Sequence, residues 1–260
     1  MLDANSADLT FKTEAQVNAY ARFFLDSNPL ETEKEFLNDE DRSEFDIRRE
    51  RNLKSQLDHF KEIDFSKANK NRVDATYYKI VESQHSKPLS SVGSISKSSR
   101  FNYKNNPLLR NRSIYFGKTK LCCEIELFHL DYNREVLRKT YLEAKSSDDI
   151  QFNRHTLYEY DISIDNILIL TTKPSLNAIS VSASTFMNEW FDINDTYEIP
   201  SASQILGTIA RIQGYKGILY KSVRYQLENN LVIFEENTGE LNFQSKSKID
   251  YFPAEELTSN

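Results

Sequence analysis

The order of apolar and polar residues divides the chain into a charged, helical beginning and a strand-rich remainder. Residues 13–27 show a capping-box spacing followed by apolar residues on one helical face. A further amphipathic helix is predicted from four apolar residues spaced by four, three and three positions: Leu53, Leu57, Phe60 and Ile63. Charged residues of both signs lie around them, as is typical of a solvated outer face. We therefore predict that residues 1–72 form an all-helical N-terminal region of two or three helices.

From residue 73 onward, short apolar runs of strand length replace this pattern. Strands are predicted at residues 75–81, 112–117, 217–223 and 229–237, and one or two strands with a turn at 158–172. Helices are predicted at residues 119–130 and 201–217, the second ending near Gly214. This mixture predicts an α+β fold with a mixed or antiparallel β core at residues 73–240 and a polar C-terminal tail at 241–260.

The predicted helix at 119–130 contains both cysteines of the chain. Thr119 can cap its first turn, and one face is predicted to be buried: Leu121, Cys122, Ile125 and Phe128 or His129. Neighbouring cysteines rarely form a disulfide, so Cys122 and Cys123 indicate a reducing compartment and a packing role. The four histidines show no ligand spacing, so no metal site is expected.

Charge is distributed unevenly along the chain. The net charge is −6, yet the window 83–123 holds eight lysines and arginines and no acidic residue. A local basic window in an acidic protein favours a small anionic partner over nucleic acid or a membrane surface. No apolar run reaches membrane-spanning length, and the first residues lack a secretory signal pattern. We therefore expect a cytoplasmic protein.

The common phosphate-binding and catalytic signatures are absent. The sequence has no G-x-x-x-x-G-K-[ST] loop, no G-x-G-x-x-G, no G-x-S-x-G and no H-E-x-x-H. With six glycines in 260 residues, a glycine-rich phosphate loop is hard to build. Side chains, arginine above all, would have to supply the phosphate contacts.

Four short motifs, in order along the chain, resemble the RES domain family. The family is named for an Arg, a Glu and a Ser, and this chain has "SRFN" with Arg100, "IYFG" with Tyr115, "CCEIE" with Glu126 and "LYKSV" with Ser222. The resemblance covers roughly residues 75–235. It implies that Arg100, Tyr115, Glu126 and Ser222 are catalytic, with Arg100, Tyr115 and Ser222 also binding the substrate.

The chain departs from the family pattern at several positions. Ser98 and Ser99 replace the glycines that usually precede the arginine, and the segment between Arg100 and Tyr115 is about five residues longer than in the family. Lys79 stands where an Arg is common and is a further candidate for substrate binding. Glu124 is the alternative to Glu126 as the catalytic carboxylate. In the basic window, Arg110 and Arg112 are additional candidate anion contacts.

The resemblance implies an NAD⁺-consuming enzyme with a fold similar to ADP-ribosyltransferase toxins, acting as the toxin of a bacterial toxin–antitoxin pair. NAD⁺ is then the substrate, no further cofactor is needed, and an antitoxin protein is the expected partner. The residues are compatible with this chemistry. NAD⁺ carries a pyrophosphate, and cleavage of its N-glycosidic bond builds positive charge on the ribose, which a carboxylate stabilises.

Two other functions stay open. A mono-ADP-ribosyltransferase would transfer the same group to a protein or nucleic acid, and the spacing of Glu124 and Glu126 is found in such enzymes. A non-catalytic module could instead bind nucleic acid through the basic window. Residues 1–72 could bind an antitoxin, join copies of the chain into a homo-oligomer, or belong to a protein delivered to a target cell without a signal peptide.

Overall fold

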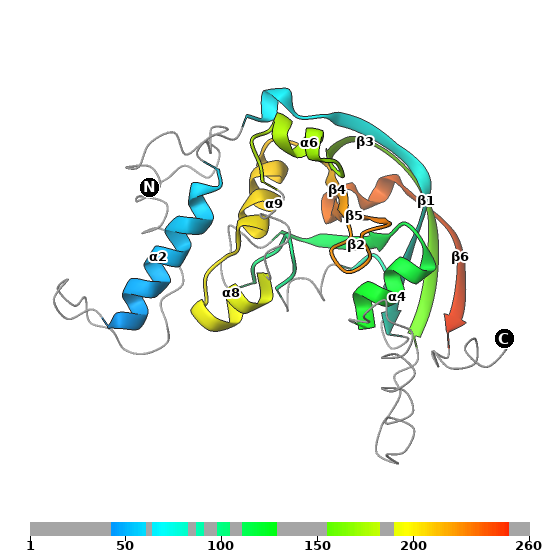
Figure 1. Cartoon of the computed structure of the whole chain (residues 1–260). Helices are drawn as coiled ribbons and strands as arrows, with labels where there is room; N and C mark the ends of the chain where they lie inside the picture. Colours follow the sequence, from blue (N-terminus) through cyan, green and yellow to red (C-terminus); the bar gives the residue numbers. More distant parts are fainter. Residues whose placement is uncertain are drawn as a thin grey trace, which may run out of the picture.

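The structure of the protein is a computed structural model, shown in Figure 1. It describes residues 43–60, 64–82, 87–90, 98–104, 111–128, 155–182 and 190–249. The predicted helix at 13–27, Ile63 and Arg110 lie outside the described residues.

Within the described residues, six strands form one sheet whose pairings close into a ring. The strands are β1 (Lys70–Glu82), β2 (Ser113–Gly117), β3 (His155–Leu170), β4 (Gly217–Lys221), β5 (Asn229–Phe234) and β6 (Leu241–Ile249). The order is β1-β2-β5-β4-β3-β6, and β3 also pairs with β1. The pairing of β3 with β4 is parallel and the others are antiparallel. The predicted α+β fold with a mixed, largely antiparallel β core is therefore confirmed.

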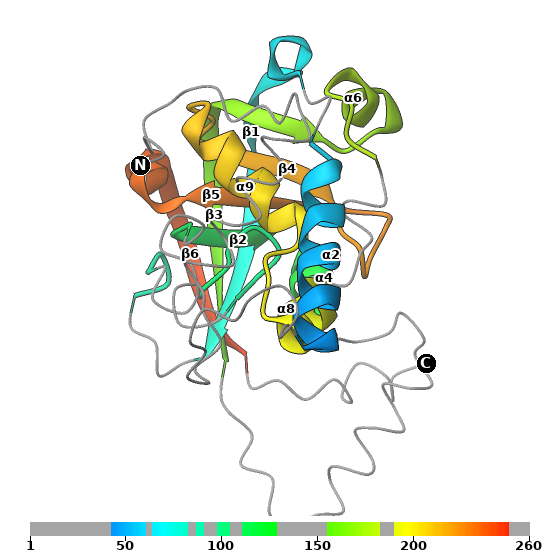
Figure 2. The same cartoon turned by 90° about the vertical axis from the view of Figure 1, so that its left-hand side faces the viewer.

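Helices pack around this sheet (Figure 1). They are α2 (Glu44–Asp58), α4 (Lys120–Phe128), α6 (Lys173–Ala178), α8 (Trp190–Tyr197) and α9 (Ala202–Ile212), with the 3₁₀ turns η2 (Phe65–Lys67) and η3 (Glu235–Glu240). Figure 2 shows α2, α8 and α9 together in front of the sheet. Among the described residues, no helix is both long and apolar enough to span a bilayer.

Strand β5 is buried on both faces and separates two hydrophobic clusters. Val232 and Phe234 pack with α2 and α9 in the first, which we call the helix-side core. Leu231 and Ile233 belong to the second, the strand-side core, with residues of β1, β2 and β3. Side chains of a strand alternate between its faces, so Asn230 falls in the helix-side series. A polar residue is thereby placed on an apolar face.

Helix α2 is part of the helix-side core. Leu53, Leu57 and Phe60 are fully buried there, which confirms the predicted amphipathic helix. Two buried polar side chains join it to the neighbouring helices. Arg49 Nε donates to the Tyr197 carbonyl at 3.0 Å, and Gln56 Oε1 accepts from the backbone N–H of Ala202 at 2.9 Å.

Several elements differ from the prediction. Strand β1 begins at Lys70, inside the region predicted to be helical. Residues 241–249, predicted to lie in a polar tail, form β6, whose polar and lysine-rich pattern is that of an edge strand. Residues 155–170 form one long strand. In α4, Leu121 is exposed and Cys123 takes its place on the buried face.

Side chains join β1 and β2, which pair at Tyr78 and Gly117. Cys123 Sγ donates to the Tyr78 carbonyl at 2.9 Å, and Lys118 Nζ to the Thr76 carbonyl at 3.1 Å. From β1, Lys79 Nζ donates to the Tyr115 carbonyl at 3.3 Å. The contact between β1 and β2 therefore depends on the side chains of Lys118 and Cys123 as well as on backbone hydrogen bonds.

Replacing Leu53 with alanine tests whether α2 belongs to the core. We expect Leu53→Ala to lower the free energy of unfolding by about 2–5 kcal/mol, because it leaves a cavity in the helix-side core. Arg51→Ala, at an exposed position of the same helix, should change it by less than about 0.5 kcal/mol. Denaturant unfolding measures both, and equal effects would contradict the assignment.

Candidate active site

One oxygen of the Glu126 carboxylate accepts two hydrogen bonds. Ser222 Oγ–H donates to Glu126 Oε1 at 2.6 Å, and Asn230 Nδ2–H donates to the same oxygen at 2.6 Å. Ser222 is fully buried and Asn230 nearly so, whereas Glu126 is partly exposed. Among the described residues no hydrogen bond to Oε2 occurs, so this oxygen is available to a substrate.

The two donors are themselves oriented by other groups. The Tyr225 backbone N–H donates to Ser222 Oγ at 2.8 Å, so the serine proton turns toward the carboxylate. Cys122 Sγ–H donates to Asn230 Oδ1 at 3.2 Å, which turns the amide nitrogen toward Glu126. Hydrogen bonds to an ionised carboxylate are stronger than neutral ones. The network therefore holds the Glu126 carboxylate in one orientation.

Strand register explains why these residues meet. Asn230 on β5 lies opposite Tyr220 on β4 and opposite Gly117 on β2. Helix α4 starts directly after Gly117, and a Cβ on this glycine would lie 2.7 Å from Cys123 Sγ and 2.9 Å from the Cys123 nitrogen. Glycine therefore allows α4 to approach the strand end and to present Glu126 to β4 and β5.

Arg100 lies in a tight turn, residues 99–102, which we call the Arg100 turn. Ser99 and Asn102 form a bridge in which each backbone N–H donates to the other's carbonyl, at 2.8 and 3.1 Å. Gln204 Nε2 donates to these same two carbonyls at 2.9 and 3.1 Å. Asn111 Nδ2 donates to the Phe101 carbonyl at 2.8 Å. The backbone of the turn is thus held by side chains from two other segments.

Tyr115 holds the same turn through its hydroxyl. The Phe101 backbone N–H donates to the phenolic oxygen at 3.0 Å, and Ser99 Oγ lies 2.9 Å from it. Burial raises the pKa of Tyr115, while its contacts with the turn lower it in part. The resemblance implied direct catalysis and substrate binding for Tyr115. The contacts described show that its hydroxyl holds the backbone of the turn that carries Arg100.

Helix α9 approaches the Arg100 turn very closely. A Cβ on Gly207 would lie 2.7 Å from the Phe101 carbonyl oxygen and 2.8 Å from the Phe101 Cβ, so only glycine fits there. One turn earlier on α9, Gln204 Oε1 accepts from the Ser201 backbone N–H and from Asn194 Nδ2, both at 2.9 Å. The amide of Gln204 therefore joins α8, α9 and the Arg100 turn.

Tyr220 connects the two halves of the site. Its ring lies 4.9 Å from the Phe101 ring in an edge-to-face arrangement. Burial raises the pKa of Tyr220 well above its usual value, the charges of Glu126 and Tyr115 raise it further, and Arg100 lowers it. Tyr220 therefore contacts the Arg100 turn through Phe101 and lies opposite Asn230, which donates to Glu126.

The remaining predicted residues have other surroundings. Lys79 lies on the strand-side face of β1, like Ala75 and Tyr77. Its Nζ lies 5.9 Å from the Phe116 ring centre and donates a hydrogen bond to the Tyr115 carbonyl. Arg112 is 63% exposed and pairs with Glu235 at 3.3 Å.

The structure also separates Glu124 from Glu126. Lys120 Nζ lies 3.6 Å from Glu124 Oε1, one helical turn away. Glu126 receives the hydrogen bonds of Ser222 and Asn230. The structure thus brings Ser222 to Glu126 and Tyr115 to the Arg100 turn, and gives Lys79, Arg112 and Glu124 different contacts.

Sequence reasoning does not identify four residues of this site: Asn111, Gln204, Tyr220 and Asn230. Asn230 had a usable signal, because it is a polar residue in register with Val232 and Phe234. Gln204 also carried one, since Ser201 and Gln204 have capping-box spacing at the start of α9. The contact of Asn111 with the turn depends on how distant segments pack and has no local signature.

Parts of this chain match a protein-family model and a solved structure. The family model described as "RES domain" matches residues 72–253. No curated protein matches the chain. Among solved structures, the chain is similar to one in the crystal structure of the M. tuberculosis MbcT-MbcA toxin-antitoxin complex. The identity is 18% and the TM-score 0.47, over 71% of this chain and 88% of that chain.

Removing the Tyr115 hydroxyl tests its role in holding the Arg100 turn. We expect Tyr115→Phe to lower the free energy of unfolding by about 1–3 kcal/mol, because the Phe101 N–H loses its acceptor in a buried place. Tyr78→Phe is the matched control, since no hydrogen bond of the Tyr78 hydroxyl occurs among the described residues. Denaturant unfolding should separate the two variants, and an unchanged Tyr115→Phe would contradict this role.

Lys79 provides a test by pH. Burial lowers its pKa to about 8, although the nearby Cys123 acts in the opposite direction. The folded protein therefore releases this proton at a lower pH than the unfolded chain, so the stability that depends on this group rises with pH above about 8. Relative to Lys79→Met, wild type should gain roughly 1–3 kcal/mol of unfolding free energy between about pH 7 and about pH 10. A difference that does not change with pH would contradict the shifted pKa.

Proposed function

The chain belongs to the RES domain family, and from this membership and the geometry of the site we propose that it is a toxin that degrades NAD⁺ by cleaving the nicotinamide N-glycosidic bond. The observation that carries the proposal is an oriented carboxylate together with an arginine whose turn is held in place by other residues. Glu126 is fixed through one oxygen by Ser222 and Asn230, and the Arg100 turn is fixed by Gln204 and Tyr115.

The proposed reaction requires a negative charge that stabilises the transition state, and it does not require a general acid. The bond between ribose C1′ and the nicotinamide nitrogen breaks, and its electron pair goes to the nicotinamide ring, which leaves as a neutral molecule. The ribose then carries oxocarbenium character, which the Glu126 carboxylate stabilises. Water adds to C1′ and releases a proton to Glu126 Oε2 or to solvent.

The fixed surroundings of Glu126 support this role. A preorganised charge needs no rearrangement during the reaction, which is why oriented groups stabilise transition states better than water does. Ser222 and Asn230 both donate to Oε1, so Oε2 can be directed at the ribose. In this proposal Glu126 is the catalytic residue, and Ser222 and Asn230 are positioning residues.

Arg100 is proposed to bind the pyrophosphate. Its guanidinium can bind two phosphate oxygens at once, and the hydrogen bonds to its turn fix the backbone from which it projects. Tyr220 packs against Phe101 of the Arg100 turn and lies opposite Asn230, the donor to Glu126, which supports one substrate spanning both. Phosphate in place of water as the acceptor would use the same residues.

Transfer to a macromolecule receives less support than hydrolysis or phosphorolysis. It was considered because Glu124 precedes Glu126 by two residues, but Glu124 is paired with Lys120 and its side chain is only 12% exposed. Its carboxylate is therefore engaged on α4. As for other members of the family, we propose a cognate antitoxin as the partner that neutralises the activity in the cell.

Incubation of the purified protein with NAD⁺ tests the proposal. Wild type should release nicotinamide, and Glu126→Gln should reduce turnover by at least about 100-fold, because the side chain keeps its size and loses the charge. Glu124→Gln is the matched control on the same helix and should retain most of the activity. Ser222→Ala should fall between them, since it misorients the carboxylate without removing it.

Two results would contradict the proposal. One is the absence of nicotinamide release by folded wild-type protein. The other is unchanged turnover in Glu126→Gln. Products formed with and without phosphate in the buffer identify the acceptor: free ADP-ribose indicates water, and a phosphorylated ADP-ribose indicates phosphate.

A further inference from the structure

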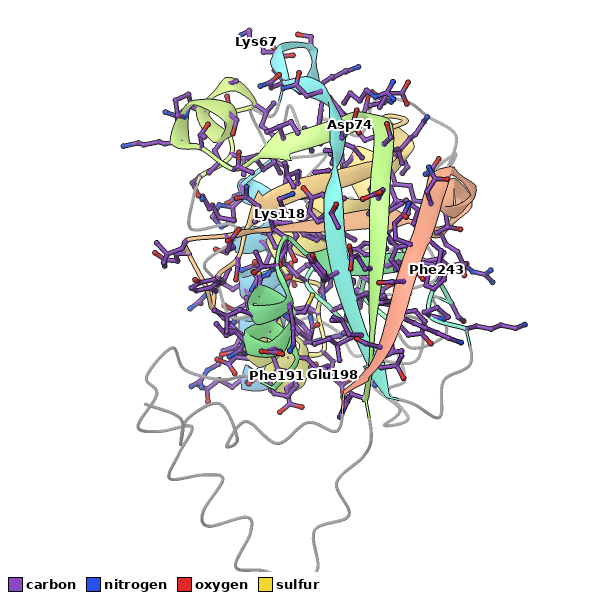
Figure 3. All side chains as sticks on the ribbon, turned by 90° about the vertical axis from the view of Figure 1, so that its right-hand side faces the viewer. Lys67, Asp74, Lys118, Phe191, Glu198 and Phe243 are labelled. Atoms are coloured by element: carbon purple, nitrogen blue, oxygen red, sulfur yellow. The ribbon has the colours of Figure 1, made fainter. Side chains whose placement is uncertain are left out.

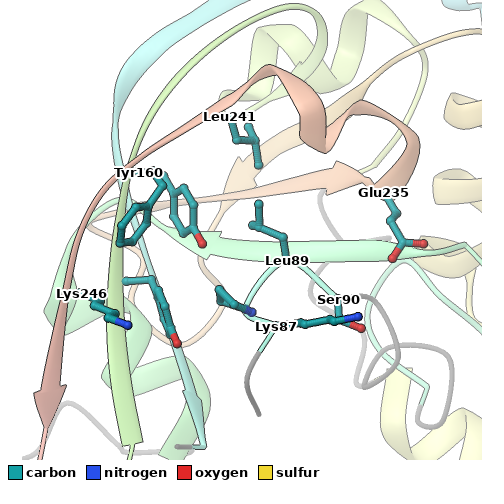
Figure 4. A pocket seen from close by; sticks show the side chains of 10 residues that line it. Lys87, Leu89, Ser90, Tyr160, Glu235, Leu241 and Lys246 are labelled. Atoms are coloured by element: carbon teal, nitrogen blue, oxygen red, sulfur yellow. The ribbon is translucent and has the colours of Figure 1, made fainter.

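A cavity lies on the strand side of the sheet. Figure 3 shows β1, β3 and β6 side by side there, with Phe243 on β6. Residues of β3, β6, η3 and the segment 87–90 line a cavity of about 710 Å³, seen from close by in Figure 4. This volume is in the range of small-molecule sites. The cavity contains no residue of the candidate active site, whose side chains lie on the helix side.

A register shift between β3 and β6 shapes this cavity. Phe243 lies opposite Tyr160, and Lys246 lies opposite Tyr158, with the irregularity between Glu159 and Tyr160. In a regular strand, residues three apart point to opposite faces. The one extra residue of β6 at the shift brings both Phe243 and Lys246 to the cavity. Such bulges are known to redirect side chains next to functional sites.

The cavity holds two phenolic hydroxyls that make no hydrogen bond with any described residue. Tyr160 is 1% exposed and Tyr158 is 9% exposed, and both line the cavity. Their rings stack at 6.5 Å, and the Phe243 ring meets Tyr160 at 5.7 Å. Figure 4 shows Tyr160 facing the space next to Leu89. Both side chains line the cavity, so their hydroxyls are donors that a bound ligand can use.

The charges at the cavity favour an anion. Lys87 and Lys246 line it from the loop and from β6, and within the described part of the chain neither ammonium forms an ion pair. The one acidic lining residue, Glu235, is already paired with Arg112 at 3.3 Å. Burial and the neighbouring Tyr158 raise the pKa of Tyr160 to about 12, so its hydroxyl is a proton donor at neutral pH.

The remaining lining residues favour a flat ring. Leu89 and Leu241 offer apolar contacts from the loop and from the start of β6, and Phe243 is half exposed beside them. An aromatic ring could pack against Phe243, while its anionic group reached the lysines and the phenols. We propose that this cavity, lined by Tyr158, Tyr160, Phe243, Lys87 and Lys246, binds a small organic anion with an aromatic ring. This site is separate from the proposed NAD⁺ chemistry and does not depend on it.

Calorimetric titration with paired probes tests the site. Adenosine monophosphate and indole-3-acetate present a ring with a phosphate or a carboxylate, and adenosine and indole-3-acetamide are their uncharged counterparts. We expect at least one anion to bind with a Kd below about 1 mM, and at least about tenfold more tightly than its uncharged counterpart. Comparison of the two anions identifies the preferred head group.

Variants of exposed lysines locate the binding without disturbing the core. Lys246→Gln and Lys87→Gln should each weaken binding by about tenfold, the effect of removing a charge-assisted contact. Lys173→Gln, an exposed lysine on α6, is the matched control and should leave the Kd unchanged. The proposal is overturned if neither anion binds below about 1 mM, or if binding is unchanged in both Lys246→Gln and Lys87→Gln.

Discussion

The hydrogen bonds of the Gln204 side chain are the interaction on which the site depends most. Gln204 is fully buried, so each of its polar atoms must find a partner within the protein. Its nitrogen holds the Arg100 turn and its oxygen holds the first turn of α9 and Asn194 of α8. Helix packing and the position of the arginine are therefore one structural requirement, and α2 adds to it through Gln56 at the start of α9.

The carboxylate half of the site is built by a different principle, the convergence of strand ends. Ser222 follows β4, Asn230 is the second residue of β5, and Glu126 comes from α4, which starts three residues after β2 ends. The last link is steric, since α4 can start there only because residue 117 is glycine. Tyr220 then interacts with both halves. The helix layer thus holds the turn that carries Arg100. Residues at the strand ends hold the carboxylate of Glu126.

The repetitive parts of the fold were predictable, because strand and helix periods are local properties. Strands β2, β4 and β5 and helices α4 and α9 follow from apolar runs and caps, while β6 does not, because its edge position leaves it few apolar residues. Arg100, Tyr115, Glu126 and Ser222 were implied by family resemblance, and their arrangement was not. Gln204 meets the Arg100 turn across 105 and 102 residues of chain, and Asn111 meets it across 10. No local pattern encodes such contacts.

The two faces of one sheet explain how two sites can coexist. Alternation sends Asn230 to the helix side and Leu231 to the strand side, so consecutive residues of β5 serve different environments. On the helix side, the protein donates hydrogen bonds to Glu126 Oε1 and to the backbone carbonyls of the Arg100 turn. On the strand side, the β6 bulge turns lysine and phenylalanine toward two phenols that the described protein leaves without hydrogen bonds. The same sheet therefore orients one set of polar groups internally and leaves another for a ligand.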